Sequence, residues 1–148
     1  MQQIIIALLT LMWGLAPALA QTTSGGIEVK DVWARIASGQ TSLFLTIVNH
    51  TATDDALLSA TSPAADKLSL QKMSVKNLKA KRKDLEAVRV PAMSATRLHP
   101  GAEYIAVEGM HEPLRPGIAL PVTLVFRRAG QIETTAIVNN QELGNRGR

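Results

Sequence analysis

The sequence predicts an all-β protein, an antiparallel β-sandwich of about nine short strands. Short apolar or alternating segments recur between Ile27 and Val138, and Gly- or Pro-containing turn signals separate them. No segment in this part of the chain combines helical periodicity with the length of an amphipathic helix. Residues 21–138 have the size of one domain and are numerous enough to bury a core.

Residues 1–20 have the pattern of a secretory signal peptide. The apolar run from Ile4 to Trp13 is shorter than the roughly 20 residues that a membrane-spanning helix needs. Ala18-Leu19-Ala20 follows it with the small-x-small pattern of a cleavage site. We therefore expect an exported, periplasmic protein that begins at Gln21 and is not transmembrane after cleavage. An uncleaved N-terminal anchor is the alternative.

The first predicted strands alternate or are continuously apolar. Residues 27–36 open with an alternation, and residues 42–49 form a nearly continuous apolar run, as in a central strand buried on both sides. Residues 56–60 and 67–73 are two further short strands, and a turn at Ser62-Pro63 separates them. The basic stretch 74–83 fits either a hairpin loop or a short helix.

The second half continues with strands at residues 85–90, 95–98 and 103–108. The clearest pair comes last: residues 120–126 alternate, Ala129-Gly130 makes a turn, and β-branched residues 131–138 return. Residues 139–148 are polar and are predicted to be a flexible tail. The residues predicted for the core are Trp33, Phe44, Leu45, Ile47, Leu124 and Phe126.

The formal net charge is +4, and the excess is concentrated between Lys67 and Lys83 and at Arg146 and Arg148. Basic patches bind nucleic acid, anionic lipid or acidic proteins, but lysines also serve solubility on a solvated loop. Export and the scarcity of aromatic residues argue against nucleic acid. The chain contains no cysteine, so neither disulfides nor a lipid-bearing cysteine are available.

No signature of catalysis is visible. The sequence has no nucleophile elbow, no phosphate-cradling glycine loop and no metalloprotease helix. His50, His99 and His111 all fall in predicted loops, where surface positions are commoner than metal sites. We therefore predict that the protein is not an enzyme.

Several segments together are similar to the periplasmic copper chaperones called PCuAC. No single segment is specific, but their order and spacing are. The resemblance implies a cupredoxin-like, antiparallel Greek-key β-sandwich over residues 27–138. The segments that carry it are residues 27–35, the strand ending at Asn49, and residues 57–65, 90–92, 98–101, 109–110, 113–117, 120–126 and 129–130.

The family holds Cu(I) with a His, a Met after ten intervening residues and, after twenty-one more, a His-x-Met. At this spacing the present chain has Gln71, Arg82, Tyr104 and Ala106. None of these is a soft ligand of the kind that selects Cu(I), and Arg82 adds a permanent positive charge. The comparison predicts a family member whose copper site is lost.

Two functional hypotheses follow from the resemblance. In the first, no metal or other cofactor binds, and the former ligand face contacts an acidic periplasmic protein or a copper-enzyme assembly factor. In the second, the protein still carries Cu(I) for copper-enzyme assembly through a different set of residues. That set comprises Met73, Met110, His111 and His99.

Overall fold

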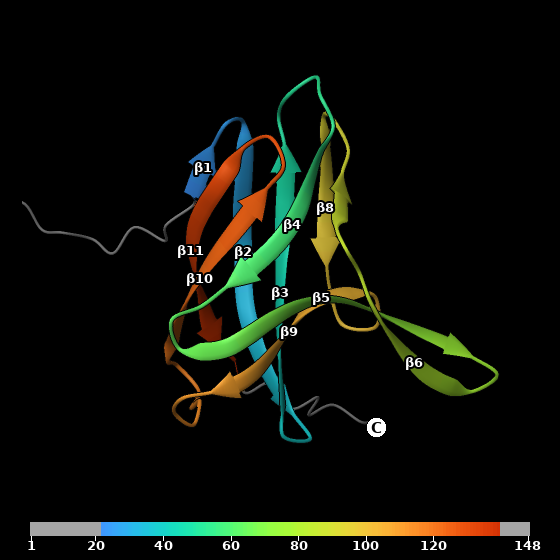
Figure 1. The fold of residues 1–148 in the computed structure, drawn as a ribbon, viewed down its shortest axis with the longest axis vertical. Coiled ribbons are helices and arrows are strands. Elements are labelled where there is room, and N and C mark those ends of the chain that lie inside the picture. Colours follow the sequence, from blue (N-terminus) through green and yellow to red (C-terminus); the bar gives the residue numbers. More distant parts are fainter. Residues whose placement is uncertain (1–21, 140–148) are drawn as a thin grey trace, which may run out of the picture.

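The computed structural model describes residues 22–139, which form eleven β-strands and no helix (Figure 1). The predicted signal peptide and nearly all of the predicted tail lie outside these residues. Because residues 22–139 contain no helix, this part of the chain has no helix that could span a membrane. The strands are β1 (Thr22–Ser24), β2 (Ile27–Ala37), β3 (Gln40–Asn49), β4 (Asp55–Thr61), β5 (Ala65–Lys76), β6 (Lys79–Asp84), β7 (Val88–Val90), β8 (Ser94–Leu98), β9 (Glu103–Met110), β10 (Ala119–Phe126) and β11 (Gly130–Val138).

All strands belong to one hydrogen-bonded sheet, in the order β6-β5-β9-β3-β2-β11-β10-β4-β7. β1 pairs with β2, and β8 pairs with the last part of β3 while β9 pairs with its first part. Every pairing is antiparallel except β2 with β11, which is parallel. The sheet is therefore mostly antiparallel, which confirms the predicted fold class.

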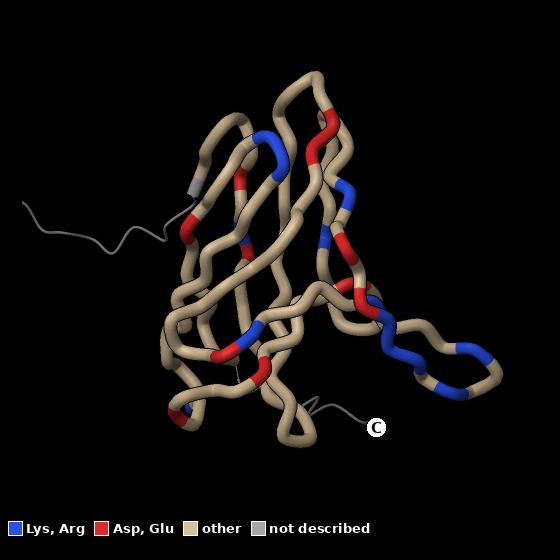
Figure 2. The backbone as a smooth tube through the Cα atoms, in the orientation of Figure 1, with Lys and Arg blue, Asp and Glu red and all other residues tan. Residues whose placement is uncertain are grey.

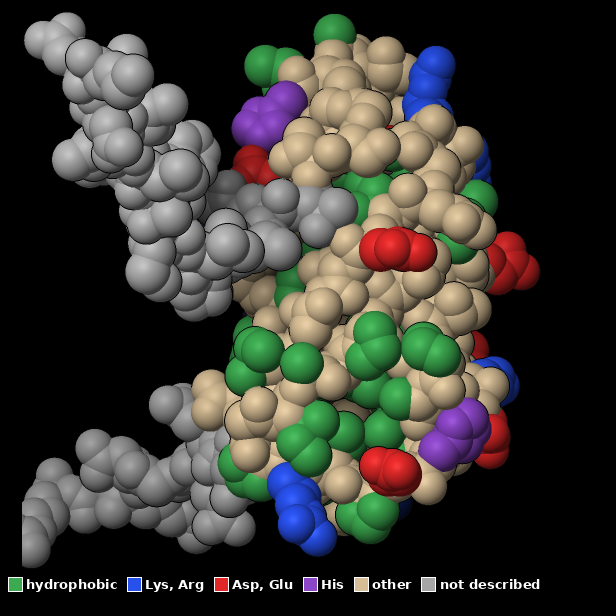
Figure 3. Space-filling view, turned by 90° about the vertical axis from the view of Figure 1, so that its left-hand side faces the viewer, with side chains coloured by type: hydrophobic (Ala, Val, Ile, Leu, Met, Phe, Trp, Pro, Cys, Tyr) green, Lys and Arg blue, Asp and Glu red, His purple; other side chains and the backbone are tan. Residues whose placement is uncertain are grey.

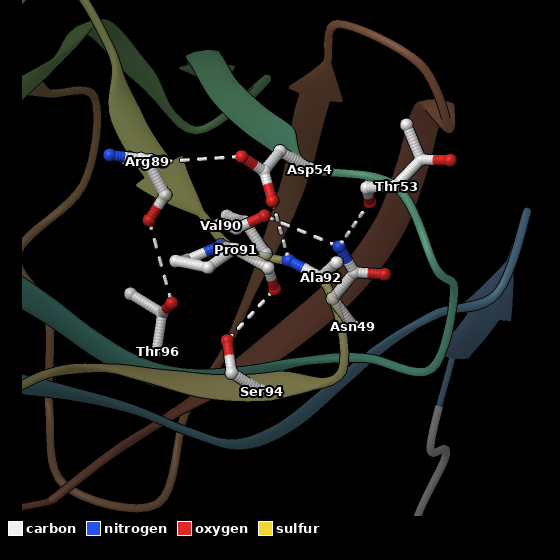
Figure 4. A network of polar contacts seen from close by, with 9 residues as sticks. All are labelled: Asn49, Thr53, Asp54, Arg89, Val90, Pro91, Ala92, Ser94 and Thr96. Carbon is white, nitrogen blue, oxygen red and sulfur yellow. Dashed lines mark hydrogen bonds and ion pairs between the residues drawn. The ribbon is translucent and has the colours of Figure 1, made fainter.

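The sheet folds over so that its far strand, β7, comes back toward β3 and β8. Asn49 at the end of β3 donates from Nδ2 to the carbonyl oxygens of Thr53 (2.9 Å) and Val90 (3.2 Å). The neighbouring carboxylate of Asp54 accepts hydrogen bonds from the Ala92 amide (2.9 Å) and from Arg89 (3.2 Å) (Figure 4). These contacts hold the two layers together at one end of the sandwich.

The core lies between the layers and is built from the inward positions of the long strands. Leu45, Ile47, Leu124 and Phe126 are at most 2% exposed, as predicted. Leu43, Leu57, Leu120 and Ile132 join them at similar burial. β3 is covered on both faces, as its continuous apolar sequence predicts, because Phe44 is also buried but packs on the outer side.

The prediction that Trp33 lies in the core is wrong. Trp33 is only half-buried, and its ring packs on Phe44 with the ring centroids 4.6 Å apart. The cause is a bulge in β2 between Lys30 and Trp33, where Asp31 adopts a φ of 53°. The bulge shifts the alternation by one residue, so Ala34 points inward where an unbroken strand would point Trp33.

The basic stretch that fits a hairpin or a helix is a hairpin. β5 and β6 pair from Gln71 with Asp84 to Lys76 with Lys79, and the turn residues Asn77 and Leu78 have φ of 52° and 60°. Two consecutive positive φ values are typical of a type I′ hairpin turn. This hairpin projects from the body of the sandwich (Figures 1 and 2).

Candidate functional site

The four positions at the copper-ligand spacing line one pocket. Gln71 comes from β5, Arg82 from β6, and Tyr104 and Ala106 from β9. The pocket has a volume of about 300 Å³, and Gly39 of the β2–β3 turn together with residues 40–42 at the start of β3 forms another wall. Residues separated by up to 35 positions in the sequence are thus brought together by the pairing of β5 with both β6 and β9.

A chain of hydrogen bonds crosses this pocket. Gln71 and Tyr104 stand directly opposite each other on β5 and β9, and the Tyr104 hydroxyl donates to Gln71 Oε1 at 2.8 Å. Gln71 Nε2 donates in turn to Asp84 Oδ1 at 2.9 Å. The hydrogen bonds orient the Gln71 amide, because its oxygen accepts on one side and its nitrogen donates on the other. Sequence reasoning missed Asp84, whose place opposite Gln71 depends on the hairpin register.

An aromatic cluster on the outer face of the sheet supports the pocket. Tyr104 is 5% exposed, and its ring lies 6.5 Å from that of Phe44, centroid to centroid. Arg35 lies with its guanidinium carbon 5.5 Å from the centre of the Phe44 ring, within the range of a cation–π contact. Trp33 completes the cluster on the other side of Phe44. The Tyr104 hydroxyl is therefore held by packing as well as by Gln71.

The side chains of the pocket do not fit Cu(I). An amide, a phenol, a guanidinium and a methyl group replace the imidazole and thioether donors that Cu(I) prefers. The Tyr104 hydroxyl and the Gln71 amide are engaged with each other, and Arg82 places a positive charge beside them. Within residues 22–139 no cluster of three or more His, Asp or Glu side chains could hold a metal ion either.

The alternative set of Met and His residues is not brought together. Met110 ends β9 opposite Ala65, the first residue of β5, and together with His111 it lines a separate pocket of about 370 Å³. His111 Nε2 is 2.8 Å from Asp66 Oδ1. Met73 lies eight residues beyond Ala65 on β5, which corresponds to about 26 Å along a strand.

His99 lies near a third pocket, beside Trp33, with its Nδ1 3.1 Å from the Pro100 carbonyl oxygen. Met73 is nearer to His99 than to the other two, because its amide donates to Ala102 in the turn that follows His99. One metal ion could not contact all four residues in this arrangement. All three histidines lie outside the strands, as predicted.

An all-β sandwich with a pocket at these spaced positions defines a domain of the PCuAC class, and solved structures agree. An apo PCuAC domain from PmoF1 is 27% identical, with a TM-score of 0.70, and the match covers 82% of this chain and 99% of that one. A copper-bound PCuAC domain from PmoF2 is 21% identical, with a TM-score of 0.68 and coverage of 82% and 98%. Cu(I)-bound DR1885 from Deinococcus radiodurans is 19% identical, with a TM-score of 0.61 and coverage of 84% and 85%.

The sequence assigns the chain to a particular family within this class. Residues 27–138 match the LpqE-like family model, described as "Putative lipoprotein LpqE-like". The chain therefore belongs to the LpqE-like family. The comparison with curated proteins gives no match.

Proposed function

We propose that this protein is an exported, non-enzymatic binding module of the PCuAC class that does not carry Cu(I) at the family's ligand positions. One observation carries the proposal. The four positions meet in a single pocket, as ligands of one ion would, but their side chains form a hydrogen-bonded set without a soft donor. The four positions are arranged like a ligand set, but their side chains lack the donors that Cu(I) prefers.

The charge of the pocket supports this proposal. Arg82 places a positive charge in the pocket, and a second cation beside it is repelled. The same charge suits a carboxylate group. We therefore infer an acidic protein as the partner, such as a factor in copper-enzyme assembly.

Rebuilding the copper site tests the proposal. The variant Gln71→His, Arg82→Met, Tyr104→His and Ala106→Met introduces the family's ligand types at the four positions. We expect the rebuilt protein to compete with a Cu(I) chelator, because the backbone already places these positions around one pocket. We expect the natural protein not to compete.

A matched variant tests the contribution of position 82. It carries the same changes at positions 71, 104 and 106 but keeps Arg82. We expect it to bind Cu(I) more weakly than the fully rebuilt protein, because one thioether is missing and the positive charge remains. Equal competition by the natural and the rebuilt proteins would contradict the proposal, and Met110 and His111 would then be tested first. Thermal unfolding of each variant shows whether the fold is intact.

A further inference from the structure

The β5–β6 hairpin carries an unusual concentration of positive charge. Residues 72–83, which we call the lysine hairpin, contain six Lys or Arg residues and no acidic residue. Every residue of β6 is exposed. In Figure 2 the blue segments crowd on this projection, whereas on the side of the molecule seen in Figure 3 the visible Lys and Arg lie at the margins.

The strand register separates this charge from the apolar side chains. Residues opposite each other in an antiparallel pair share a face, and neighbours along a strand alternate. One face therefore carries Met73, Val75, Ala80 and Arg82, and continues into the pocket face at Gln71. The other face carries five lysines in two rows: Lys72, Lys76, Lys79, Lys81 and Lys83.

The lysine face works against the stability of the hairpin. Lys76 is directly opposite Lys79, and Lys72 is directly opposite Lys83. Like charges in such positions destabilise a pair of strands. The described residues offer these lysines only one ion pair, between Lys72 Nζ and Glu103 Oε1 at 3.9 Å. The other lysines of this face are therefore available to bind an anion outside the described residues.

The tip of the hairpin is apolar. Leu78 is 100% exposed and Val75 is 72% exposed. Leu78 also occupies a left-handed backbone conformation, which a residue with a branched apolar side chain rarely adopts. Because Leu78 is fully exposed in this turn, its side chain buries no apolar surface that would stabilise the fold. Leu78 lies in the turn of the projecting hairpin, between Lys76 and Lys79, so its side chain is free to insert into an apolar layer outside the protein.

We propose that the lysine hairpin binds the surface of an anionic lipid membrane, with Leu78 entering the interface while the lysines contact lipid phosphates. Protein interfaces are depleted in lysine and favour Arg and aromatic anchors. A row of lysines instead acts as a set of point charges toward many phosphates, as in basic segments at membranes. The projecting hairpin can reach a flat surface without hindrance from the sandwich (Figure 1). The proposal does not depend on the loss of the copper site.

Co-sedimentation with lipid vesicles tests the proposal on the purified exported protein. We expect binding to vesicles of equal parts phosphatidylglycerol and phosphatidylcholine, no binding to phosphatidylcholine alone, and loss of binding at high salt. The variant Lys76→Gln, Lys79→Gln should bind roughly thirtyfold more weakly, since each lysine near the surface contributes about fivefold. Its matched control is Arg127→Gln, Arg128→Gln, which makes the same charge change at exposed positions away from the hairpin and should bind normally.

A second variant separates membrane entry from charge. Leu78→Asn suits the left-handed conformation and keeps the fold, but it removes the apolar tip. We expect about tenfold weaker binding to the mixed vesicles, and unchanged binding to soluble polyglutamate as a purely electrostatic probe. Equal vesicle binding by the Lys76/Lys79 variant and the natural protein would overturn the proposal. Binding to polyglutamate but not to vesicles would overturn it in favour of an acidic protein partner.

Discussion

At the scale of single residues, two adjacent aspartates show how burial separates identical side chains. Asp55 is 6% exposed, and its carboxylate accepts hydrogen bonds from the amides of Ala56 (2.7 Å), Arg128 (2.9 Å) and Ala129 (3.0 Å). Asp55 is the first residue of β4, and its hydrogen bonds therefore link β4 to the turn between β10 and β11. Asp54 is exposed, and the Ala92 amide, followed by Arg89, lowers the pKa of its carboxyl group.

The two aspartates should differ in their effect on stability. Asp55→Ala removes a buried carboxylate that accepts three backbone hydrogen bonds, so we expect a loss of about 3 kcal/mol in the free energy of unfolding. Asp54→Ala should cost clearly less, because water reaches its partners. Chemical denaturation of both variants measures the difference. Asp55→Asn, which keeps one acceptor oxygen, should fall between them; an equal cost for the two alanine variants would contradict the role assigned to Asp55.

Residue patterns also explain why the prediction for Trp33 fails. A period of two carries Ile27 and Val29 inward and extrapolates to Trp33, and large aromatic residues favour cores. The bulge at Asp31 breaks that period, and the next buried residue of β2 is Ala34. Its result is the outer cluster of Trp33 with Phe44 and Tyr104, which supports the pocket.

At the scale of elements, β5 has two parts with different surroundings. From Ala65 to Lys72 it is paired with β9, and its residues Ala65 and Leu70 are buried in the core. Beyond Lys72 it pairs only with β6, whose residues are all exposed. One strand thus begins as part of the sandwich and ends as part of the lysine hairpin.

This division predicts different local stabilities along β5. We expect amides of Ser74 to Lys76 and Lys79 to Lys83 to exchange hydrogen with solvent much faster than hydrogen-bonded amides of Lys67 to Leu70, because opposed lysines and the absence of core contacts favour local opening. Residue-resolved hydrogen exchange measures this, with Leu43 to Ile47 of β3 as the protected reference. Uniform protection along β5 would show that the hairpin is as stable as the sandwich.

At the scale of the whole molecule, one sheet provides two separate surfaces. The pocket around Gln71 and Tyr104 is lined by residues of β3, β5, β6 and β9. The lysine face lies on the opposite side of the β5–β6 hairpin, and the apolar tip lies at its end. A protein bound to a membrane through the hairpin would keep its pocket close to that membrane.

Export of the whole molecule is testable by intact mass. We predict that the protein recovered from the periplasm begins at Gln21, because the apolar run before Ala18-Leu19-Ala20 is too short to remain as a membrane-spanning anchor. Mass spectrometry of the purified protein distinguishes this form from the full chain. A mass that includes residues 1–20 would mean that the segment stays attached as an anchor. The vesicle experiments control for that case, since all variants share this segment.

The sequence by itself determined the all-β class, most strand positions and most of the core. These features depend on local alternation and on turn residues, which are visible along one chain. The four positions of the pocket came from the resemblance to the PCuAC family. The sequence also determined that none of Gln71, Arg82, Tyr104 and Ala106 is a soft ligand.

Only the tertiary structure decided which residues meet. The hydrogen bonds from Tyr104 to Gln71 and on to Asp84, the separation of Met110 from Met73, and the lysine face all depend on strand register. Register is set by long-range pairing and by local bulges, and a shift of one residue moves every side chain to the other face. Such a shift in β2, in its pairing with β3, places Trp33 outside the core.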